Sequence, residues 1–216
     1  MFILCSRNRP NFILDFIKCC QKTNFSSLVT ILVDEDDPQI DDYKAIEYPK
    51  NWAVLYNESA KPVIKLNTWL KDNMHHEFYG VLADDIRPKT IDWDKKLILA
   101  VKNNQIAYPN DTIKCEKLST IPIIGGDIVR CTGWLSNPEL IHYYADDVWM
   151  YIGTQTNKLH YLHDVICQHL HYSVGTTVID ETTQNLEIHF AADYQSYTRW
   201  VNNPQTAELL EKIKAI

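Results

Sequence analysis

Residues 78–88 read Phe-Tyr-Gly-Val-Leu-Ala-Asp-Asp-Ile-Arg-Pro. A short apolar run of strand length leads directly into the carboxylate doublet Asp84-Asp85. In an open α/β sheet, ligands bind outside the carboxyl ends of the strands. This stretch therefore predicts a sheet strand and, at its end, the edge where binding residues gather.

The residues that precede this stretch predict strands alternating with helices. The apolar run 2–5 is followed by the amphipathic stretch 11–21, and the β-branched run 28–33 ends in an acidic loop. Residues 52–56 and 61–73 add a third strand and a further helix. Strands that alternate with helices favour a largely parallel sheet covered on both faces.

The second half of the chain has a less regular pattern. We expect short strands at 97–101 and 106–108, an apolar run at 121–124, a short helix at 127–132 capped by Gly133, a helix at 146–152, an ambiguous segment at 161–170, and closing helices at 184–202 and 204–216. No repeat or linker divides the chain, so one domain is expected.

Composition excludes several classes of protein. Of the 216 residues, 45% are hydrophobic and 23% are charged, which is typical of a globular domain. The net charge of -7 lacks the basic excess of nucleic-acid binders and makes nucleic acid an unfavoured partner. The six glycines match neither a dinucleotide fingerprint nor a phosphate-binding P-loop.

The cysteines and the hydropathy of the chain indicate in which cellular compartment the protein is expected. The six cysteines form no C-x-x-C pair and are expected to be reduced thiols. No stretch approaches the length of about 18 apolar residues that a transmembrane helix needs. We therefore expect a cytoplasmic protein without a transmembrane segment.

Charged residues follow three of the predicted strands. The loop 6–9 carries two arginines, the loop 34–37 is acidic, and the doublet 84–85 ends the fourth strand. Carboxylates crowded at one edge repel each other unless a divalent cation neutralises them, and Mg²⁺ or Mn²⁺ typically combines one or two carboxylates with substrate phosphates. This set of residues predicts a site for a metal-bound nucleoside diphosphate.

A second acidic doublet and a pair of histidines lie in the second half. Asp147 is the expected general base for an acceptor hydroxyl, and Asp146 is the alternative, since one of the two is expected to cap a helix. Adjacent carboxylates raise one pKa, which suits a base near neutrality. In a strand, His169 and His171 point to one face, and we favour His171 as a metal ligand over a purely structural role.

Several motifs together resemble the nucleotide-sugar half of GT-A glycosyltransferases, particularly the inverting family 2 type. They are SRNRP (6–10), VDEDD (33–37) and GVLADDIRP (80–88). Downstream motifs resemble the acceptor segment, the motif of the catalytic base and the late metal-binding histidine: PIIGGD (122–127) with GWL (133–135), ADDVW (145–149) and HLH (169–171). Their order and spacing carry the resemblance, because each motif alone is common.

The resemblance implies a GT-A, Rossmann-like α/β fold with a mixed, mostly parallel sheet flanked by helices. One domain would span 1–216, with a nucleotide-sugar-binding half at about 1–95 and an acceptor-binding half with C-terminal helices at about 96–216. The implied activity is metal-dependent transfer of a sugar from a nucleoside diphosphate sugar to a hydroxyl, with inversion and an Asp general base.

The resemblance also implies individual roles. Asp85 would bind Mn²⁺ or Mg²⁺, and Asp84 would contact the ribose or assist the metal; Ile86 stands where the family often has a further acidic residue, so the division between the two stays open. Asp34 would accept hydrogen bonds from the nucleotide base. The remaining expected metal ligand is His169, the expected donor contacts are Ser6, Arg7, Arg9, Asp36, Lys61 and Asn67, and the expected acceptor-side residues are Gly125 and Trp134.

Two other functions stay open. A nucleotidyltransferase also needs paired carboxylates and a divalent metal, although it usually has a glycine-rich phosphate loop. A noncatalytic nucleotide-sugar-binding module is the third possibility. UDP- and GDP-sugars are the favoured donors and a glycan or small molecule is the favoured acceptor, whereas the sugar, the base and the oligomeric state are not specified by the sequence.

Overall fold

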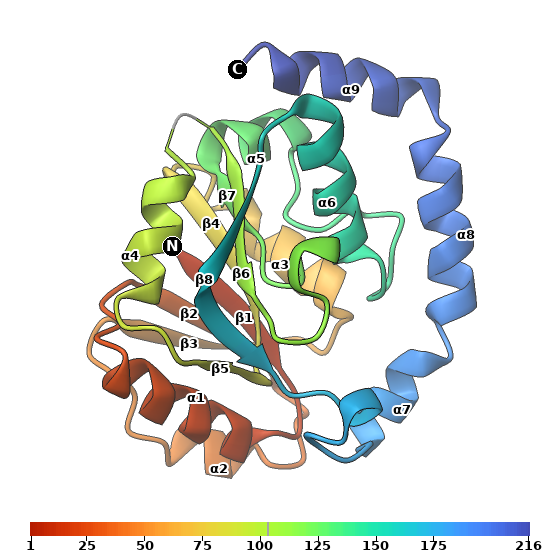
Figure 1. Cartoon of the computed structure of the whole chain (residues 1–216). Helices are drawn as coiled ribbons and strands as arrows, with labels where there is room; N and C mark the ends of the chain where they lie inside the picture. Colours follow the sequence, from red (N-terminus) through yellow and green to blue (C-terminus); the bar gives the residue numbers. More distant parts are fainter. Residues whose placement is uncertain (103) are drawn as a thin grey trace.

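The computed structural model describes residues 1–102 and 104–216. Their strands form one sheet in the order β3-β2-β1-β4-β7-β6-β8-β5 (Figure 1). The strands are β1 (Phe2–Ser6), β2 (Val29–Asp34), β3 (Trp52–Asn57), β4 (Phe78–Ala83), β5 (Ile86–Pro88), β6 (Ile106–Asn110), β7 (Ile123–Gly125) and β8 (Leu159–His169). β1 to β4 are parallel neighbours, β7 is antiparallel to β4 and β6, and β8 runs parallel to β6 and antiparallel to β5.

Helices cover the sheet on both faces (Figure 1). They are α1 (Pro10–Lys22), α2 (Ile40–Lys44), α3 (Pro62–Lys71), α4 (Trp93–Ala100), α5 (Gly126–Thr132), α6 (Ala145–Thr156), α7 (Glu181–Glu187), α8 (Phe190–Val201) and α9 (Pro204–Lys214), with 3-10 turns at Cys115–Lys117 and Tyr172–Val174. This mixed, mostly parallel sheet flanked by helices confirms the expected fold class.

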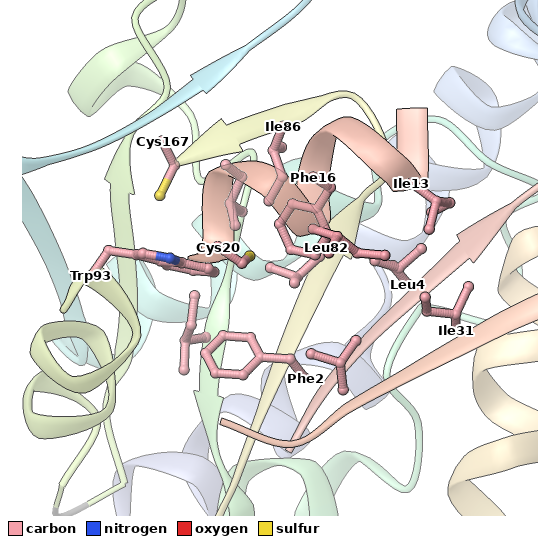
Figure 2. Close-up of a cluster of buried hydrophobic side chains, with 14 of the residues drawn as sticks. Phe2, Leu4, Ile13, Phe16, Cys20, Ile31, Leu82, Ile86, Trp93 and Cys167 are labelled. Atoms are coloured by element: carbon pink, nitrogen blue, oxygen red, sulfur yellow. The ribbon is translucent and has the colours of Figure 1, made fainter. Parts of the chain in front are cut away.

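Alternation along the strands explains the two layers. Phe2 and Leu4 of β1 belong to the core shared with α1 and α4, whereas Ile3 belongs to the core shared with α3, because successive strand side chains point to opposite faces. Figure 2 shows Phe2, Phe16 and Trp93 converging within the first of these cores. Both faces of the central strands are therefore buried.

The predicted first-half strands and helices are confirmed, but two predictions for the second half are wrong. Residues 97–101 do not form a strand: they lie in and just after α4, where Leu97 is buried with Trp93 one turn before it while Leu99 is 62% exposed. The expected helix 184–202 is two helices, α7 and α8, separated at Ile188 and His189. The ambiguous segment 161–170 belongs to strand β8.

Three further observations concern a helix cap, the length of the helices and the state of the cysteines. Gly133 ends α5 with a φ of 76°, the left-handed conformation that a C-terminal cap requires, as predicted. None of the helices in the described ranges combines the length and the apolar character that crossing a bilayer requires. The cysteines of the described residues are free thiols.

Candidate functional site

The parallel strands bring their carboxyl ends to one edge of the sheet. Ser6 ends β1 opposite Val33 of β2, and Cys5 pairs with Ala83, so that the residues following these strands are neighbours. Three expected site residues, Ser6, Asp34 and Asp84, meet at this edge because parallel strands end at the same side. We call it the donor edge.

Asp84 is a buried carboxylate held from two sides. The Ser6 hydroxyl donates a hydrogen bond to its Oδ2 at 2.7 Å, and the Arg9 guanidinium lies 3.2 Å from its Oδ1. Burial raises the pKa of Asp84, the neighbouring charge of Asp85 raises it further, and Arg9 opposes both effects. Its oxygens are thus already engaged by protein groups.

Asp34 is also buried and lies between two cations. Its Oδ1 accepts a hydrogen bond from Lys65 at 2.8 Å, and its Oδ2 accepts one from Arg7 at 2.9 Å. Arg7 also contacts Asp36 at 2.6 Å, so both expected residues of the acidic loop take part in ion pairs. Lys65 was not predicted; the signal was a lysine between Val63 and Leu66 on the buried face of α3.

Asp85 faces His169 because β5 pairs with the end of β8. Ile86 lies opposite His169 in the antiparallel register, and the Leu170 amide donates to the Asp85 carbonyl at 2.9 Å. Asp85 Oδ1 lies 3.3 Å from His169 Nε2 and otherwise has no hydrogen-bond partner among the described residues. A buried carboxylate oxygen left in this state is a position for a ligand or an ion.

The electrostatics of this pair favour the charged forms. Burial alone raises the pKa of Asp85, but His169 and Arg9 outweigh it and the pKa lies below its usual value. Burial lowers the pKa of His169, and Asp85 outweighs that effect and raises it. Each group therefore stabilises the charged form of the other.

Asp85 and His169 offer two ligands to a divalent cation, which would displace the proton from the imidazole because a metal-bound histidine is neutral. Carboxylate oxygen and imidazole nitrogen both suit Mn²⁺, and substrate phosphates can complete its coordination. The His171 ring is 5.7 Å from that of His169, and its Nδ1 contacts Ser173 Oγ at 2.7 Å. Within residues 1–102 and 104–216, no group of three or more side chains is arranged as a complete metal site.

The second acidic doublet lies close to the donor edge through a chain of hydrogen bonds. The His169 amide donates to the Asp111 carbonyl at 2.9 Å, and the Asp111 carboxylate accepts from Thr120 at 3.0 Å. The adjacent Ser119 donates to the carbonyl of Asp146 at 3.0 Å. The first turn of α6 is therefore fixed relative to His169.

Asp146 and Asp147 are adjacent carboxyl groups that influence each other's pKa. Burial raises the pKa of Asp146 to about 7, with a further contribution from the charge of Asp147. Burial also raises the pKa of Asp147, and its hydrogen bond with Asp146 opposes this. The Asp147 amide donates to Asp146 Oδ1 at 3.1 Å. The pKa of Asp146 is the more strongly raised of the two, so Asp147 loses its proton more readily.

Two expected donor residues have other partners. The Asn67 side chain accepts hydrogen bonds from the amides of Leu135 and Ser136 at 2.9 and 3.2 Å and donates to the Ser136 carbonyl at 2.7 Å. Lys61 Nζ lies 3.1 Å from the His189 ring. Asn67 thus fixes the segment after α5, and Lys61 contacts the C-terminal part of the chain.

The two expected acceptor-side residues are not brought to the donor edge. Trp134 packs against Trp149, with ring centroids 5.1 Å apart, in the second core. Gly125 pairs with Phe78, at the opposite end of β4 from Asp84. A Cβ at Gly125 would lie 2.7 Å from the Cα of Asn104, so close backbone approach explains this glycine.

The C-terminal segment contributes contacts that the sequence did not indicate. Asp180 binds the Arg9 guanidinium through both oxygens, at 2.6 and 2.7 Å, and Thr182 donates to the Arg7 carbonyl at 3.2 Å. Buried Asp193 accepts hydrogen bonds from three successive amides, Ile141 to Tyr143, at 2.8 to 2.9 Å. Residues 180–193 therefore bind both the donor edge and the loop that precedes α6.

Comparisons with known proteins bear on the fold. No protein-family model and no curated protein sequence matches the chain. A mannosyltransferase from Pyrobaculum calidifontis, solved with GDP-Man and Mn²⁺, has a similar structure, with a TM-score of 0.66 and 12% identity over 99% of this chain and 67% of that one. TarS from S. aureus has a TM-score of 0.55 and 14% identity over 77% of this chain and 58% of its own.

A nucleotidyltransferase is also among the similar structures. A putative glucose-1-phosphate thymidylyltransferase from Bacillus anthracis has a TM-score of 0.51 and 9% identity over 75% of this chain and 85% of that chain. At these identities the similarity concerns the fold: the chain has the GT-A-like α/β fold that glycosyltransferases and nucleotidyltransferases share.

Proposed function

We propose that the protein transfers a sugar from a nucleoside diphosphate sugar to an acceptor hydroxyl. The observation that supports the proposal is a buried Asp85 oxygen at the carboxyl edge of the sheet. Apart from its contact with His169, this oxygen has no hydrogen-bond partner among the described residues. These two residues would hold Mn²⁺ or Mg²⁺, with His171 as a further ligand. A bound divalent ion would neutralise charge on the departing diphosphate.

The donor edge suits a nucleotide. Asp34, fixed by Lys65 and Arg7, would accept hydrogen bonds from the base, and the Arg7–Asp36 pair would lie beside it. Asp84, oriented by Ser6, would contact the ribose, and Arg9 would face the diphosphate. UDP- and GDP-sugars are the proposed donors.

Asp147 is the proposed general base. A base must be ionised to accept a proton, and the pKa of Asp146 is raised more strongly than that of Asp147. Asp147 would take the proton of the acceptor hydroxyl while the acceptor oxygen bonds to the anomeric carbon. The bond between that carbon and the diphosphate oxygen breaks, and the configuration inverts, as in the family 2 enzymes that the motifs resemble.

Product analysis tests the proposal. The protein is incubated with UDP- and GDP-sugars and MnCl₂, and slow hydrolysis without acceptor should release nucleoside diphosphate. Release of pyrophosphate from a nucleoside triphosphate and a sugar phosphate would instead favour a nucleotidyltransferase, which the thymidylyltransferase-like fold supports as the second candidate. Donor binding without turnover, with every acceptor class tried, would indicate a noncatalytic binding module.

A further inference from the structure

Five aromatic rings from two distant segments form a cluster beside the acidic doublet. Tyr144 is stacked on Tyr197 at 5.4 Å and lies 5.7 Å from Tyr194 and 5.4 Å from Phe190. The Tyr143 ring is 5.2 Å from Phe190. We call these five residues the aromatic platform; it joins α8 to the loop before α6.

Tyr144 and Tyr197 pack against the second core, whereas the other edge of the platform is exposed to solvent. Phe190 is 52% exposed and Tyr194 is 55% exposed. In the described residues, the hydroxyls of Tyr143, Tyr144, Tyr194 and Tyr197 have no hydrogen-bond partner, whereas a tyrosine in a protein core usually has one. Aromatic faces in contact with solvent, with free hydroxyls at their rims, are suited to an amphipathic ligand.

The platform lies at the reacting end of the proposed acceptor site. Tyr144 immediately precedes α6 and has a φ of 66°, a left-handed conformation that is unfavourable for a tyrosine. Asp193 fixes the preceding amides and so maintains this conformation. Strained residues of this kind concentrate at ligand-binding sites, and this one precedes Asp146 and Asp147 by two and three positions.

A shallow, open hollow adjoins the platform at Tyr194 and runs along α8. It has a volume of about 540 Å³ and is lined by Tyr194, Gln195, Thr198, Arg199, Asn202 and Asn203. Arg199 is paired with Glu139, 3.3 Å away. Asn202 donates to the Thr198 carbonyl and Asn203 accepts from the Gln205 amide, so the Gln195 amide and the Thr198 hydroxyl are the lining groups without a hydrogen-bond partner among the described residues. Such groups hydrogen-bond neutral hydroxyls.

We infer that the platform and the hollow bind a neutral carbohydrate acceptor of two or more sugar units. The C–H face of a sugar ring would stack on Tyr144 and Tyr194, because the negative face of an aromatic ring attracts polarised C–H groups. The next unit would extend along α8 toward Gln195 and Thr198. This inference rests on the proposed function and specifies its acceptor class as a glycan.

Neutral oligosaccharides of one to four units, from the gluco-, manno-, galacto- and N-acetylglucosaminyl series, provide the test by saturation-transfer NMR. We expect binding by at least one series, with affinity that increases from one unit to two. Tyr194→Ala should weaken it about three- to tenfold, and Tyr194→Phe, which keeps the ring, should restore it. Leu99→Ala, which removes an equally exposed apolar side chain from α4, is the control.

Two results would overturn the acceptor assignment. One is absence of binding by every series in a protein that still binds a nucleotide sugar with Mn²⁺ by calorimetry. The other is equal affinity in wild type and Tyr194→Ala. In both cases the proposed transferase stands. Failure of the wild type to bind any nucleotide sugar would instead remove the proposed function itself, so the two failures are distinguishable.

Discussion

Replacing Asp180 by Asn should strengthen donor binding. In the structure both oxygens of Asp180 bind the guanidinium of Arg9, the cation proposed to face the donor diphosphate. Burial raises the pKa of Asp180, but Arg9 and Thr183 outweigh it and hold the pKa at about 2, so Asp180 is ionised in any ordinary assay and would compete with the proposed donor diphosphate for Arg9. The neutral amide of the Asp180→Asn variant would leave Arg9 without that anionic partner.

The size of the effect follows from the exposure of the pair. Hydrogen bonds to charged groups contribute about 1.5 to 3 kcal/mol. The Arg9 side chain is 16% exposed and that of Asp180 is 33% exposed, so solvent screening reduces the competition to about 1 to 2 kcal/mol. Donor affinity should therefore rise about five- to thirtyfold.

Calorimetric titration with UDP- and GDP-sugars in MnCl₂ measures this change. Asn keeps an oxygen that can accept the Thr183 amide, which lies 2.8 Å from Asp180 Oδ1, so the N-terminal cap of α7 should persist. Glu181→Gln, which removes an exposed carboxylate from the same helix, is the matched control. Equal donor affinity in wild type and Asp180→Asn would refute the argument that Asp180 and the diphosphate compete for Arg9.

Four other outcomes are expected. Asp85→Asn should keep the fold and weaken Mn²⁺-dependent donor binding more than about tenfold, measured by calorimetry. Asp147→Asn should lower turnover at least about a hundredfold with donor affinity nearly intact. Asp146→Asn should stabilise the fold at pH 8 and little at pH 4, because a carboxyl whose pKa is raised to about 7 loses its stabilising contribution as the pH rises from 4 through 7. Lys65→Met should cost about 3 kcal/mol in urea unfolding, since it leaves buried Asp34 with Arg7 alone.

Each of these outcomes has a contrary result. Unchanged metal dependence in Asp85→Asn would remove Asp85 from the metal site. Wild-type turnover in both doublet variants would make Asp146 and Asp147 structural. A pH-independent difference in melting temperature for Asp146→Asn would contradict its raised pKa. Wild-type stability of Lys65→Met would mean that Arg7 and water suffice for Asp34.

The donor edge could be predicted from the sequence because each strand and the polar residues at its end are adjacent in the chain. Each strand of the parallel half is a short apolar run that ends in charged or hydroxyl residues, as in 78–85, and parallel strands align those ends. Local composition failed at 97–101, where five apolar residues suit a buried strand and a helix equally. Tertiary packing decides between strand and helix, and here Leu97 is buried while Leu99 is exposed.

The remaining parts of the site depend on contacts between distant residues. Arg9 and Asp180 are separated by 171 positions, and Asp193 binds amides about 50 positions before it. The residues next to Asp193 in the sequence do not show that its carboxylate binds a distant loop, because an exposed aspartate can have similar neighbours. Asp85 and His169 were both predicted as ligands, but their 3.3 Å approach depends on the pairing of β5 with β8.

The strand order also has a consequence for synthesis on the ribosome. β1 to β4 are adjacent in the sheet and come from the first 83 residues, so they can pair early. β5 follows β4 directly in the chain, yet its partner in the sheet is β8, which ends at His169. Asp85 therefore acquires its imidazole neighbour only after residue 169 has left the exit tunnel. A nascent chain with four paired strands would still lack the proposed cation site.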